Sequence, residues 1–160
     1  TAPVYSAYTG IQFTNEQIEE ILKQKGVAYT RLEDAELYDR IVNKLMEPGV
    51  VGWFSGRAEF GPRALGGRSI IADPRNPKAK DLLNLKIKRR ESFRPFAPSI
   101  LNEYTGEYFE KVELVPFMEK VFPIKRDKQD TIPAVTHVDG TGRLQTVMKE
   151  VSPRYYALID

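Results

Sequence analysis

A glycine- and arginine-rich stretch, residues 55–69, restricts the fold more than any other part of the chain. It lies between two short apolar runs, 50–54 and 69–72, whose β-branched and aromatic residues are typical of buried strands. Four glycines allow close backbone approach and unusual dihedral angles, and three arginines supply planar sets of N–H donors. We therefore expect a cationic loop that connects two strands.

The positive charge of the chain is concentrated around this loop. Residues 57–94 contain seven arginines and four lysines against four acidic residues, a net charge of +7, whereas the whole chain carries +2. Like charges at this density repel one another unless solvent or an anion screens them. The region is therefore expected either to form a solvated cationic face or to bind an anion.

The composition of the 160 residues excludes several kinds of site. Without cysteine the chain has no disulfide, thiolate nucleophile or sulfur ligand, and a single histidine cannot build a multi-histidine metal site. The chain has no run of about 18 apolar residues, the length that a membrane-spanning helix needs, and its first residues do not resemble a leader peptide. We expect a single domain over 1–160 that is cytoplasmic, contacts no membrane and holds no metal of its own.

Helical spacing of apolar residues predicts four helices. Each begins after a residue that can cap a helix, and two of these caps are followed by proline, which is favoured in the first turn. Glycine or a Pro-Gly pair follows the first two helices and stops them. The expected caps are Thr14, Asp34, Asn76 and Ser152, and the expected stops are Gly26 and Pro48-Gly49.

Three further apolar runs predict additional strands. Residues 95–101 contain two prolines, so this strand is expected at a sheet edge or a bulge. Residues 132–138 and 143–148 flank the turn 139–142, a pattern typical of a β-hairpin. Helices and strands together predict an α/β (α+β) domain with one mixed sheet and flanking helices.

Arg57, Arg63 and Arg68 are the first candidate binding residues. Guanidinium groups match the geometry of phosphate and carboxylate oxygens, so the loop suits a phosphate-bearing ligand. Neither the Walker pattern nor the dinucleotide-binding fingerprint is present. A purely structural loop and a surface for a protein partner are the alternatives.

Residues 86–96 form a second basic cluster, in which five cations are mixed with two phenylalanines. Such a mixture can hold single-stranded nucleic acid, with cations on the backbone and rings stacked on bases. The structural alternative places the cations at the C-terminal end of the third helix and the rings in the core. Arg94, between two aromatic residues, is the candidate ligand contact of this cluster.

A third group surrounds the single histidine, His137. It lies beside Asp139, Thr141 and Arg143, which could orient a triphosphate or a metal-bridged phosphate. A solitary histidine is more often structural, and side chains alternate along a strand, so only part of the group can face one site. His137 and Arg143 are its strongest candidates.

Three stretches together resemble the C-terminal, YrdC-like domain of the O-carbamoyltransferases, a family that includes nodulation-type and antibiotic-modifying enzymes. The stretches are GRAEFGPRALGGRSIIADPR (56–75), ESFRPFAPSIL (91–101) and THVDGTGRLQTV (136–147). The resemblance covers nearly the whole chain, from about residue 5 onwards. Gly67 departs from the pattern, because the family commonly has asparagine there in GPRALGNRS, but every arginine is kept.

The resemblance implies a YrdC-like mixed, twisted sheet and one half of a two-step transferase. Such a domain uses ATP with Mg and carbamoyl phosphate to make carbamoyl adenylate, releasing phosphate and pyrophosphate. A larger N-terminal, iron-containing domain of the same polypeptide then passes the carbamoyl group to a hydroxyl. The histidine content of this chain is consistent with this division, because a single histidine cannot build an iron site. An RNA- or tRNA-binding YrdC-like module is the alternative, although the glycine-rich setting of the basic residues argues against nucleic acid.

The resemblance also implies roles for individual residues. Arg57, Arg63 and Arg68 are expected to act as the catalytic residues, since the reaction presses several negative charges together and fixed cations neutralise them. The remaining expected substrate and nucleotide contacts are Arg94, Ser69, His137, Arg143 and Thr141. Members of the family usually continue past a segment like RYYALID (154–160) into an NTSFN-type strand that completes the nucleotide site. We therefore expect a fragment, truncated at its C-terminus, with weak or absent adenylation by itself.

Overall fold

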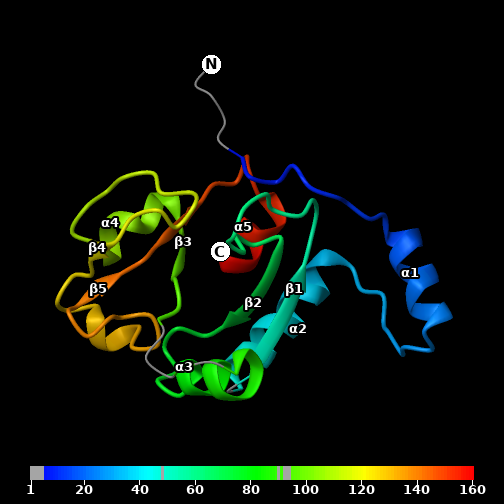
Figure 1. Ribbon diagram of the computed structural model, residues 1–160, viewed down its shortest axis with the longest axis horizontal. Helices are drawn as coiled ribbons and strands as arrows, with labels where there is room; N and C mark the ends of the chain where they lie inside the picture. The colour runs from blue at the N-terminus through cyan, green and yellow to red at the C-terminus, as the bar shows by residue number, and fades with distance from the viewer. Residues whose placement is uncertain (1–5, 48, 90, 92–94) are drawn as a thin grey trace.

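The computed structural model describes residues 6–47, 49–89, 91 and 95–160. Its elements are α1 (Asn15–Gln24), α2 (Asp34–Met46), β1 (Val50–Phe54), β2 (Arg68–Ala72), α3 (Ala79–Asp81), the π-helical η1 (Leu82–Lys88), β3 (Ser99–Leu101), the 3₁₀-helical η2 (Asn102–Tyr104), α4 (Thr105–Tyr108), β4 (Phe122–Pro123), the 3₁₀-helical η3 (Gln129–Thr131), β5 (Thr141–Gly142), β6 (Gln145–Val147) and α5 (Pro153–Ile159). Figure 1 shows α1 on an arm at one side, β1, β2, α2 and α5 in the middle, and α4, β4 and β5 at the other side.

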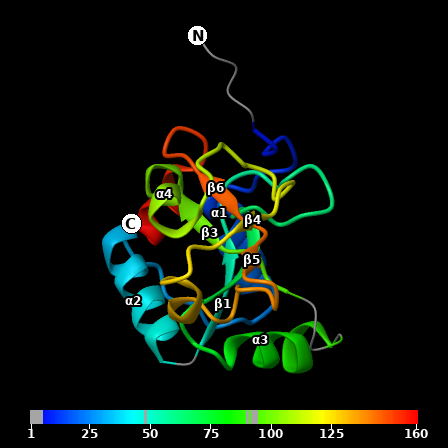
Figure 2. The same ribbon diagram turned by 90° about the vertical axis from the view of Figure 1, so that its left-hand side faces the viewer.

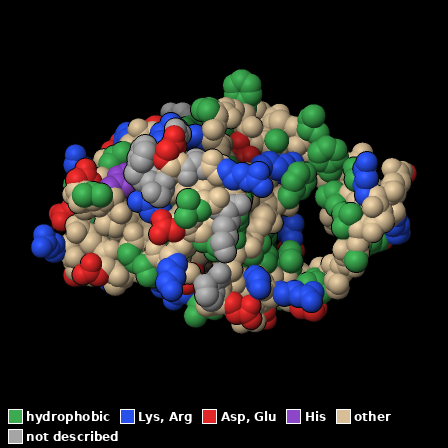
Figure 3. Space-filling view, turned by 60° about the horizontal axis from the view of Figure 1, so that its bottom comes forward, with side chains coloured by type: hydrophobic (Ala, Val, Ile, Leu, Met, Phe, Trp, Pro, Cys, Tyr) green, Lys and Arg blue, Asp and Glu red, His purple; other side chains and the backbone are tan. Residues whose placement is uncertain are grey.

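Helix α1 is fixed by its own cap rather than by packing. The Thr14 hydroxyl accepts the Gln17 N–H at 3.3 Å, and Gln17 Oε1 accepts the Thr14 N–H at 2.9 Å, so the predicted capping box is confirmed. Gly26 follows the helix with a φ of +62°, the left-handed geometry expected of it. No residue of α1 is buried. Hydrophobic side chains border the hollow between this arm and the body of the molecule (Figure 3).

One core lies between α2, the β1–β2 pair and α5. The two strands pair antiparallel from Val50↔Ala72 to Phe54↔Arg68. Alternation along β1 sends Trp53 inward, where it is 6% exposed, and leaves Phe54 on the outer face, 54% exposed. The buried members of this core are Ile41, Trp53, Leu101, Val147, Tyr155 and Leu158. The apolar stripe predicted for α2 therefore packs on the strand that follows it.

A second core lies on the other side of the parallel β3–β6 pair (Figure 2). Leu101 and Val147 belong to the first core, whereas Ile100, the next residue along β3, packs against the second. The buried members of the second core are Phe109, Val115, Phe122, Ile124, Ile132, Val135 and Leu144. The short β3–β6 pair thus joins the two halves of the molecule.

Two expectations about the sheet are wrong for the described part of the chain. Its strands form three separate pairs, β1–β2, β3–β6 and β4–β5, instead of one mixed sheet. Residues 132–138 form turns rather than the first strand of a hairpin. The Val135 N–H and the Thr136 hydroxyl both donate to the Ile132 carbonyl, which closes a turn where a strand would need a ladder bond.

The helix boundaries also differ from those expected. Asp34 is the first residue of α2 and not its cap, while Pro48 lies outside the described residues. Asn76 Oδ1 accepts the Lys78 N–H at 3.0 Å, so it caps a turn, and helical structure starts only at Ala79. The proline-interrupted run 95–101 forms a ladder only as β3, whereas α5 begins at a proline as expected.

Within the part of the chain that the structure describes, no helix has both the length and the apolar character that a bilayer crossing demands.

Candidate functional site

The loop between β1 and β2 is organised around the carboxylate of Glu59. Its Oε1 atom accepts three backbone N–H groups, from Leu65 at 2.7 Å, Gly67 at 2.6 Å and Arg68 at 3.1 Å. A Cβ at position 67 would lie 3.1 Å from that oxygen and 2.9 Å from the Arg57 carbonyl, so glycine permits this approach. An internal carboxylate therefore occupies backbone donors that would suit an anion.

These hydrogen bonds set the charge of Glu59. Partial burial raises the pKa of its carboxyl group, but the backbone N–H groups of Leu65, Gly67 and Arg68 together outweigh burial, and the pKa lies below its ordinary value. Glu59 is therefore ionised at neutral pH and places one negative charge inside the cationic loop.

Arg68 and Arg57 tie the loop to the N-terminal segment. Arg68 donates to four backbone carbonyls, those of residues 11, 55, 56 and 67, at 2.9 to 3.3 Å. Its guanidinium carbon also lies 3.5 Å from the centroid of the Phe54 ring. Arg57 donates to the Gly10 carbonyl at 3.2 Å. Most donors of Arg68 are thus used within the chain.

Arg63 differs from these two arginines. Its side chain is partly buried, and its guanidinium makes no hydrogen bond or ion pair to any residue of the described chain. It lies in the middle of a loop whose later part, around Leu65 and Gly67, is fixed by Glu59. Among the described residues, none occupies the N–H donors of Arg63. The loop that carries this side chain is held in place by Glu59.

The later part of the loop is anchored to the core through Gly66. Its N–H donates to the Ser69 hydroxyl at 2.9 Å, and its carbonyl accepts the indole N–H of Trp53 at 2.7 Å. The ring of Tyr155 packs directly on this glycine. Burial raises the pKa of Tyr155 to about 12, so its hydroxyl stays protonated and donates to Ser99 at 2.8 Å. Ser69 therefore lies at the base of the loop as part of its support.

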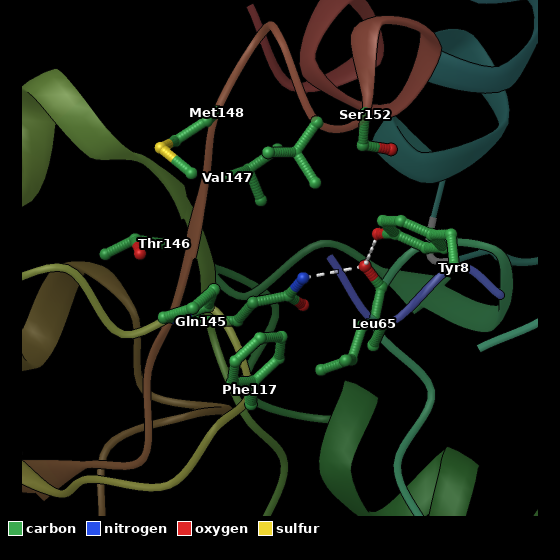
Figure 4. Close-up of a pocket in the computed structure, with 11 residues that line it drawn as sticks. Tyr8, Leu65, Phe117, Gln145, Thr146, Val147, Met148 and Ser152 are labelled. Atoms are coloured by element: carbon green, nitrogen blue, oxygen red, sulfur yellow. Dashed lines mark hydrogen bonds between the residues drawn. The ribbon is translucent and has the colours of Figure 1, made fainter. Parts of the chain in front are cut away.

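A small cavity lies between this loop, the N-terminal segment and β6 (Figure 4). Its volume is about 20 Å³, room for about one water molecule. On its wall the Leu65 carbonyl accepts two hydrogen bonds, from the Tyr8 hydroxyl and from Gln145 Nε2, each at 2.6 Å. Gln145 therefore joins the loop to the segment that carries His137 and Arg143.

The second group of predicted residues surrounds a tight turn, 137–141. The His137 N–H donates to the Thr141 carbonyl at 2.8 Å, and the Gly140 N–H donates to the His137 carbonyl at 2.9 Å. The imidazole Nδ1 lies 3.0 Å from the Thr141 hydroxyl oxygen, which is 2.7 Å from a carboxylate oxygen of Asp139. His137 and Thr141 thus belong to one chain of hydrogen bonds that ends at Asp139.

The surroundings of the imidazole favour its neutral form. Burial lowers the pKa of His137, the charge of Asp139 raises it by less, and the positive charges of Lys80 and Arg143 lower it again. The net effect is a pKa below the ordinary histidine value. Two cations therefore stand near a neutral histidine.

Arg143 is held at one of its nitrogens. Its Nε donates to the Met118 carbonyl at 2.7 Å, while its two terminal nitrogens bond no residue of the described chain. Arg94 lies outside the described residues, so the cluster 86–96 is described only in part. Among residues 6–47, 49–89, 91 and 95–160, no three histidine, aspartate or glutamate side chains are grouped so as to hold a metal ion.

The structure thus arranges the predicted site residues in two groups. The loop group is Arg57, Arg63, Arg68 and Ser69, and the turn group is His137, Thr141 and Arg143. The contact between Gln145 and Leu65 links them. Sequence reasoning missed Glu59, Lys80 and Gln145 as members of this region; a single acidic residue inside a strongly cationic loop was the available signal for Glu59.

Comparison with known proteins gives consistent matches. The sequence profile of the family described as "Carbamoyltransferase C-terminus" matches residues 42–160. Nodulation protein NolO of Bradyrhizobium diazoefficiens is 41% identical over 157 residues, which cover 96% of this chain and 29% of that protein. Nodulation protein NolNO of Sinorhizobium fredii is 46% identical over 128 residues, 78% of this chain and 19% of that protein. An uncharacterised protein of Synechocystis is 46% identical over 175 residues, 96% of this chain and 28% of that protein. The chain spans less than a third of the length of these relatives.

Proposed function

The chain belongs to the carbamoyltransferase family, whose C-terminal region it matches, and from this premise we propose that it forms carbamoyl adenylate from MgATP and carbamoyl phosphate. Hydrolysis of carbamoyl phosphate releases phosphate and leaves carbamate. A carbamate oxygen then attacks the α-phosphorus of ATP, and pyrophosphate leaves. The proposal includes the YrdC-like fold, the cytoplasmic location and the N-terminal, iron-containing domain that the resemblance implies.

The observation that carries this proposal is that two groups of cationic side chains lie on segments that a hydrogen bond connects. Arg63 keeps donors available among the described residues, while Lys80 and Arg143 stand near His137, and Gln145 connects the two segments. The reaction brings anionic carbamate to an anionic nucleotide and expels pyrophosphate, so it requires fixed positive charge rather than a covalent nucleophile. Arginine and lysine on an ordered frame supply that charge.

The residues divide the work according to their contacts. We assign Arg63 and the terminal nitrogens of Arg143 to phosphate oxygens, because these groups keep donors available among the described residues. Arg57, Arg68 and Ser69 hold the loop in place, and any contact they make with substrate uses their remaining donors. Arg94 is retained as a proposed phosphate contact.

Calorimetric titration of the chain with MgATP and with carbamoyl phosphate tests the proposal. We expect saturable binding of each, weakened at least tenfold by Arg63→Ala, which removes a charge-assisted contact. Arg40→Ala removes the same charge from the exposed surface of α2 and is the matched control, expected to bind like the parent chain. Absence of binding, here and in a longer polypeptide extended at both ends, would overturn the proposal.

Binding of RNA is the alternative function, and it depends on the cluster 86–96. Filter binding during a salt titration separates the two, because contacts with a nucleic acid backbone weaken steeply as salt rises. Tight, salt-sensitive RNA binding together with no affinity for carbamoyl phosphate would favour the alternative.

A further inference from the structure

The imidazole of His137 carries a nitrogen, Nε2, that is closed off from solvent and has no hydrogen-bond partner within the described part of the chain. A buried polar atom without a partner is costly to folding, so such atoms are uncommon and call for an explanation. The other ring nitrogen, Nδ1, is bonded to Thr141 and thereby fixes the orientation of the ring. Nε2 is therefore held at one defined position with its hydrogen-bonding capacity unused.

The position of the imidazole proton follows from counting donors along the chain of hydrogen bonds. The Thr141 hydroxyl has one hydrogen, and the ionised Asp139 carboxylate 2.7 Å away can only accept, so that hydrogen points to Asp139. The contact between Nδ1 and the Thr141 oxygen at 3.0 Å then requires Nδ1 to be the donor. In the neutral imidazole the proton is on Nδ1, and Nε2 carries a lone pair.

The charges around the ring determine which kind of ligand can donate a hydrogen bond to Nε2. Lys80, on α3, and Arg143 act on the imidazole as positive charges, while Asp139 is engaged with Thr141. Both cations attract anions, but a fully ionised phosphate oxygen would be repelled by a nitrogen lone pair. The fitting ligand therefore combines an anionic group for the cations with an N–H donor for Nε2.

Carbamoyl phosphate has this combination, because its amide nitrogen carries hydrogens and is joined through the carbonyl carbon to the oxygen that bridges to phosphorus. We propose that Nε2 of His137 accepts a hydrogen bond from the carbamoyl N–H while Lys80 and Arg143 face the phosphate. This assignment rests on the proposed function and goes beyond it, since it makes His137 the residue that distinguishes a carbamoyl group from other acyl groups. It also adds Lys80 to the proposed phosphate contacts. Nε2 is closed off in this structure, so the proposal requires that the groups covering it move when the ligand binds.

Acetyl phosphate is the matched probe, because a methyl group replaces the amino group of the carbamoyl moiety while the carbonyl and the phosphate are kept. We expect the chain to bind carbamoyl phosphate about tenfold more tightly than acetyl phosphate, the factor that one hydrogen bond supplies. His137→Phe keeps a ring but lacks the acceptor and is expected to bind both probes equally. His137→Gln restores an acceptor and is expected to recover part of the preference. Thermal unfolding of both variants checks that they are folded.

The proton position provides a test that needs no binding measurement. The chain has a single histidine, so a long-range ¹H–¹⁵N NMR spectrum reports on this ring alone. We expect the unprotonated nitrogen to be Nε2, and its signal to move when carbamoyl phosphate is added but not when acetyl phosphate is added. A proton on Nε2 in the neutral free chain would overturn the inference.

The outcomes separate this inference from the proposed function. If the parent chain binds MgATP and binds the two probes with equal affinity, the role of His137 is overturned and carbamoyl adenylate formation is left standing. Failure to bind either probe or MgATP would overturn both. Loss of the preference in His137→Phe, with recovery in His137→Gln, supports the inference.

Discussion

The Glu59 carboxylate accepts the N–H of Gly67 at 2.6 Å, the shortest of its three backbone hydrogen bonds within the loop. A loop rich in arginine is thus folded around an anion that the loop itself supplies. The negative charge also offsets repulsion among the surrounding guanidinium groups. The carboxylate of Glu59 therefore stabilises the fold of the loop, and the arginines around it can have different roles.

Replacing Glu59 with glutamine tests this role. The amide side chain would keep the shape but lose the charge, and hydrogen bonds to a neutral amide oxygen are weaker than those to a carboxylate. We expect Glu59→Gln to lower the free energy of unfolding by about 1–2 kcal/mol. Urea denaturation measures the change. Glu110→Gln, at an exposed position, is the control and should remain within about 0.5 kcal/mol of the parent chain. Equal stability of the two variants would contradict the role assigned to Glu59.

The same carboxylate predicts a pH dependence. Because the pKa of Glu59 is lower in the folded chain than in the unfolded chain, its stabilising contribution is complete above the unfolded pKa. The contribution is lost as pH falls through the lower, folded pKa. We therefore expect the difference in melting temperature between the parent chain and Glu59→Gln to be largest at neutral pH and to vanish in acid. A difference that stays constant over this range would exclude the linkage.

Gly66 allows the Tyr155 ring to pack against the loop. An alanine Cβ at this position would lie 2.6 Å from Cε1 and 2.7 Å from Cγ of that ring, and the φ of +104° is unfavourable for any L side chain. We expect Gly66→Ala to destabilise the chain by about 2–4 kcal/mol, measured by thermal denaturation. Gly52→Ala is the matched control, because no atom lies within 4 Å of a Cβ there and its φ is not positive. It should change stability by less than about 1 kcal/mol.

Two arginines of the loop should respond differently to replacement by lysine. Arg68 bonds four carbonyls with two nitrogens, a pattern that a single ammonium group cannot reproduce, whereas Arg63 has no such bond among the described residues. We expect Arg68→Lys to reduce stability by about 1–2 kcal/mol and to expose the segment around Ile11 to proteolysis. Arg63→Lys should leave both measurements unchanged. The reverse order would show that Arg63 is the structural arginine.

The elements that the sequence predicted well are those fixed by local contacts. The capping box at Thr14 and Gln17, the stripe that buries Ile41 and the strand containing Trp53 depend on residues a few positions apart. Hydrogen bonding within such a segment and the side on which its apolar residues lie are readable from spacing alone. Their boundaries agree with the structure to within a residue or two.

The errors concern contacts between distant segments. The partner of β6 is β3, 46 residues earlier at the Ser99–Gln145 contact, and no local pattern specifies that pairing. Residues 132–138 alternate like a strand, yet the Thr136 hydroxyl and Val135 N–H bond the Ile132 carbonyl and close a turn. For the site, the arginine content of the loop indicated where cations gather. It could not indicate that the guanidinium of Arg68 is occupied by backbone carbonyls, because those contacts depend on the folded structure.

Gln145 offers the most direct test of the link between the two groups of site residues. Its Nε2 donates to the Leu65 carbonyl at 2.6 Å, and the side chain is only 4% exposed. In Gln145→Glu an ionised carboxylate would face that carbonyl, so we expect a loss of about 2–4 kcal/mol at neutral pH, larger than for Gln145→Leu.

The sign of the pH effect distinguishes a lost hydrogen bond from a packing defect in Gln145→Glu. Burial raises the pKa of an introduced carboxyl group, and its protonated form can donate to the Leu65 carbonyl as the amide does. The penalty should therefore be absent below the unfolded pKa and grow as pH rises through the folded pKa. Relative to Gln145→Leu, thermal denaturation should show the glutamate variant regaining stability in acid. A constant gap between the two variants at every pH would mean that the contact with Leu65 does not join the two groups through a hydrogen bond.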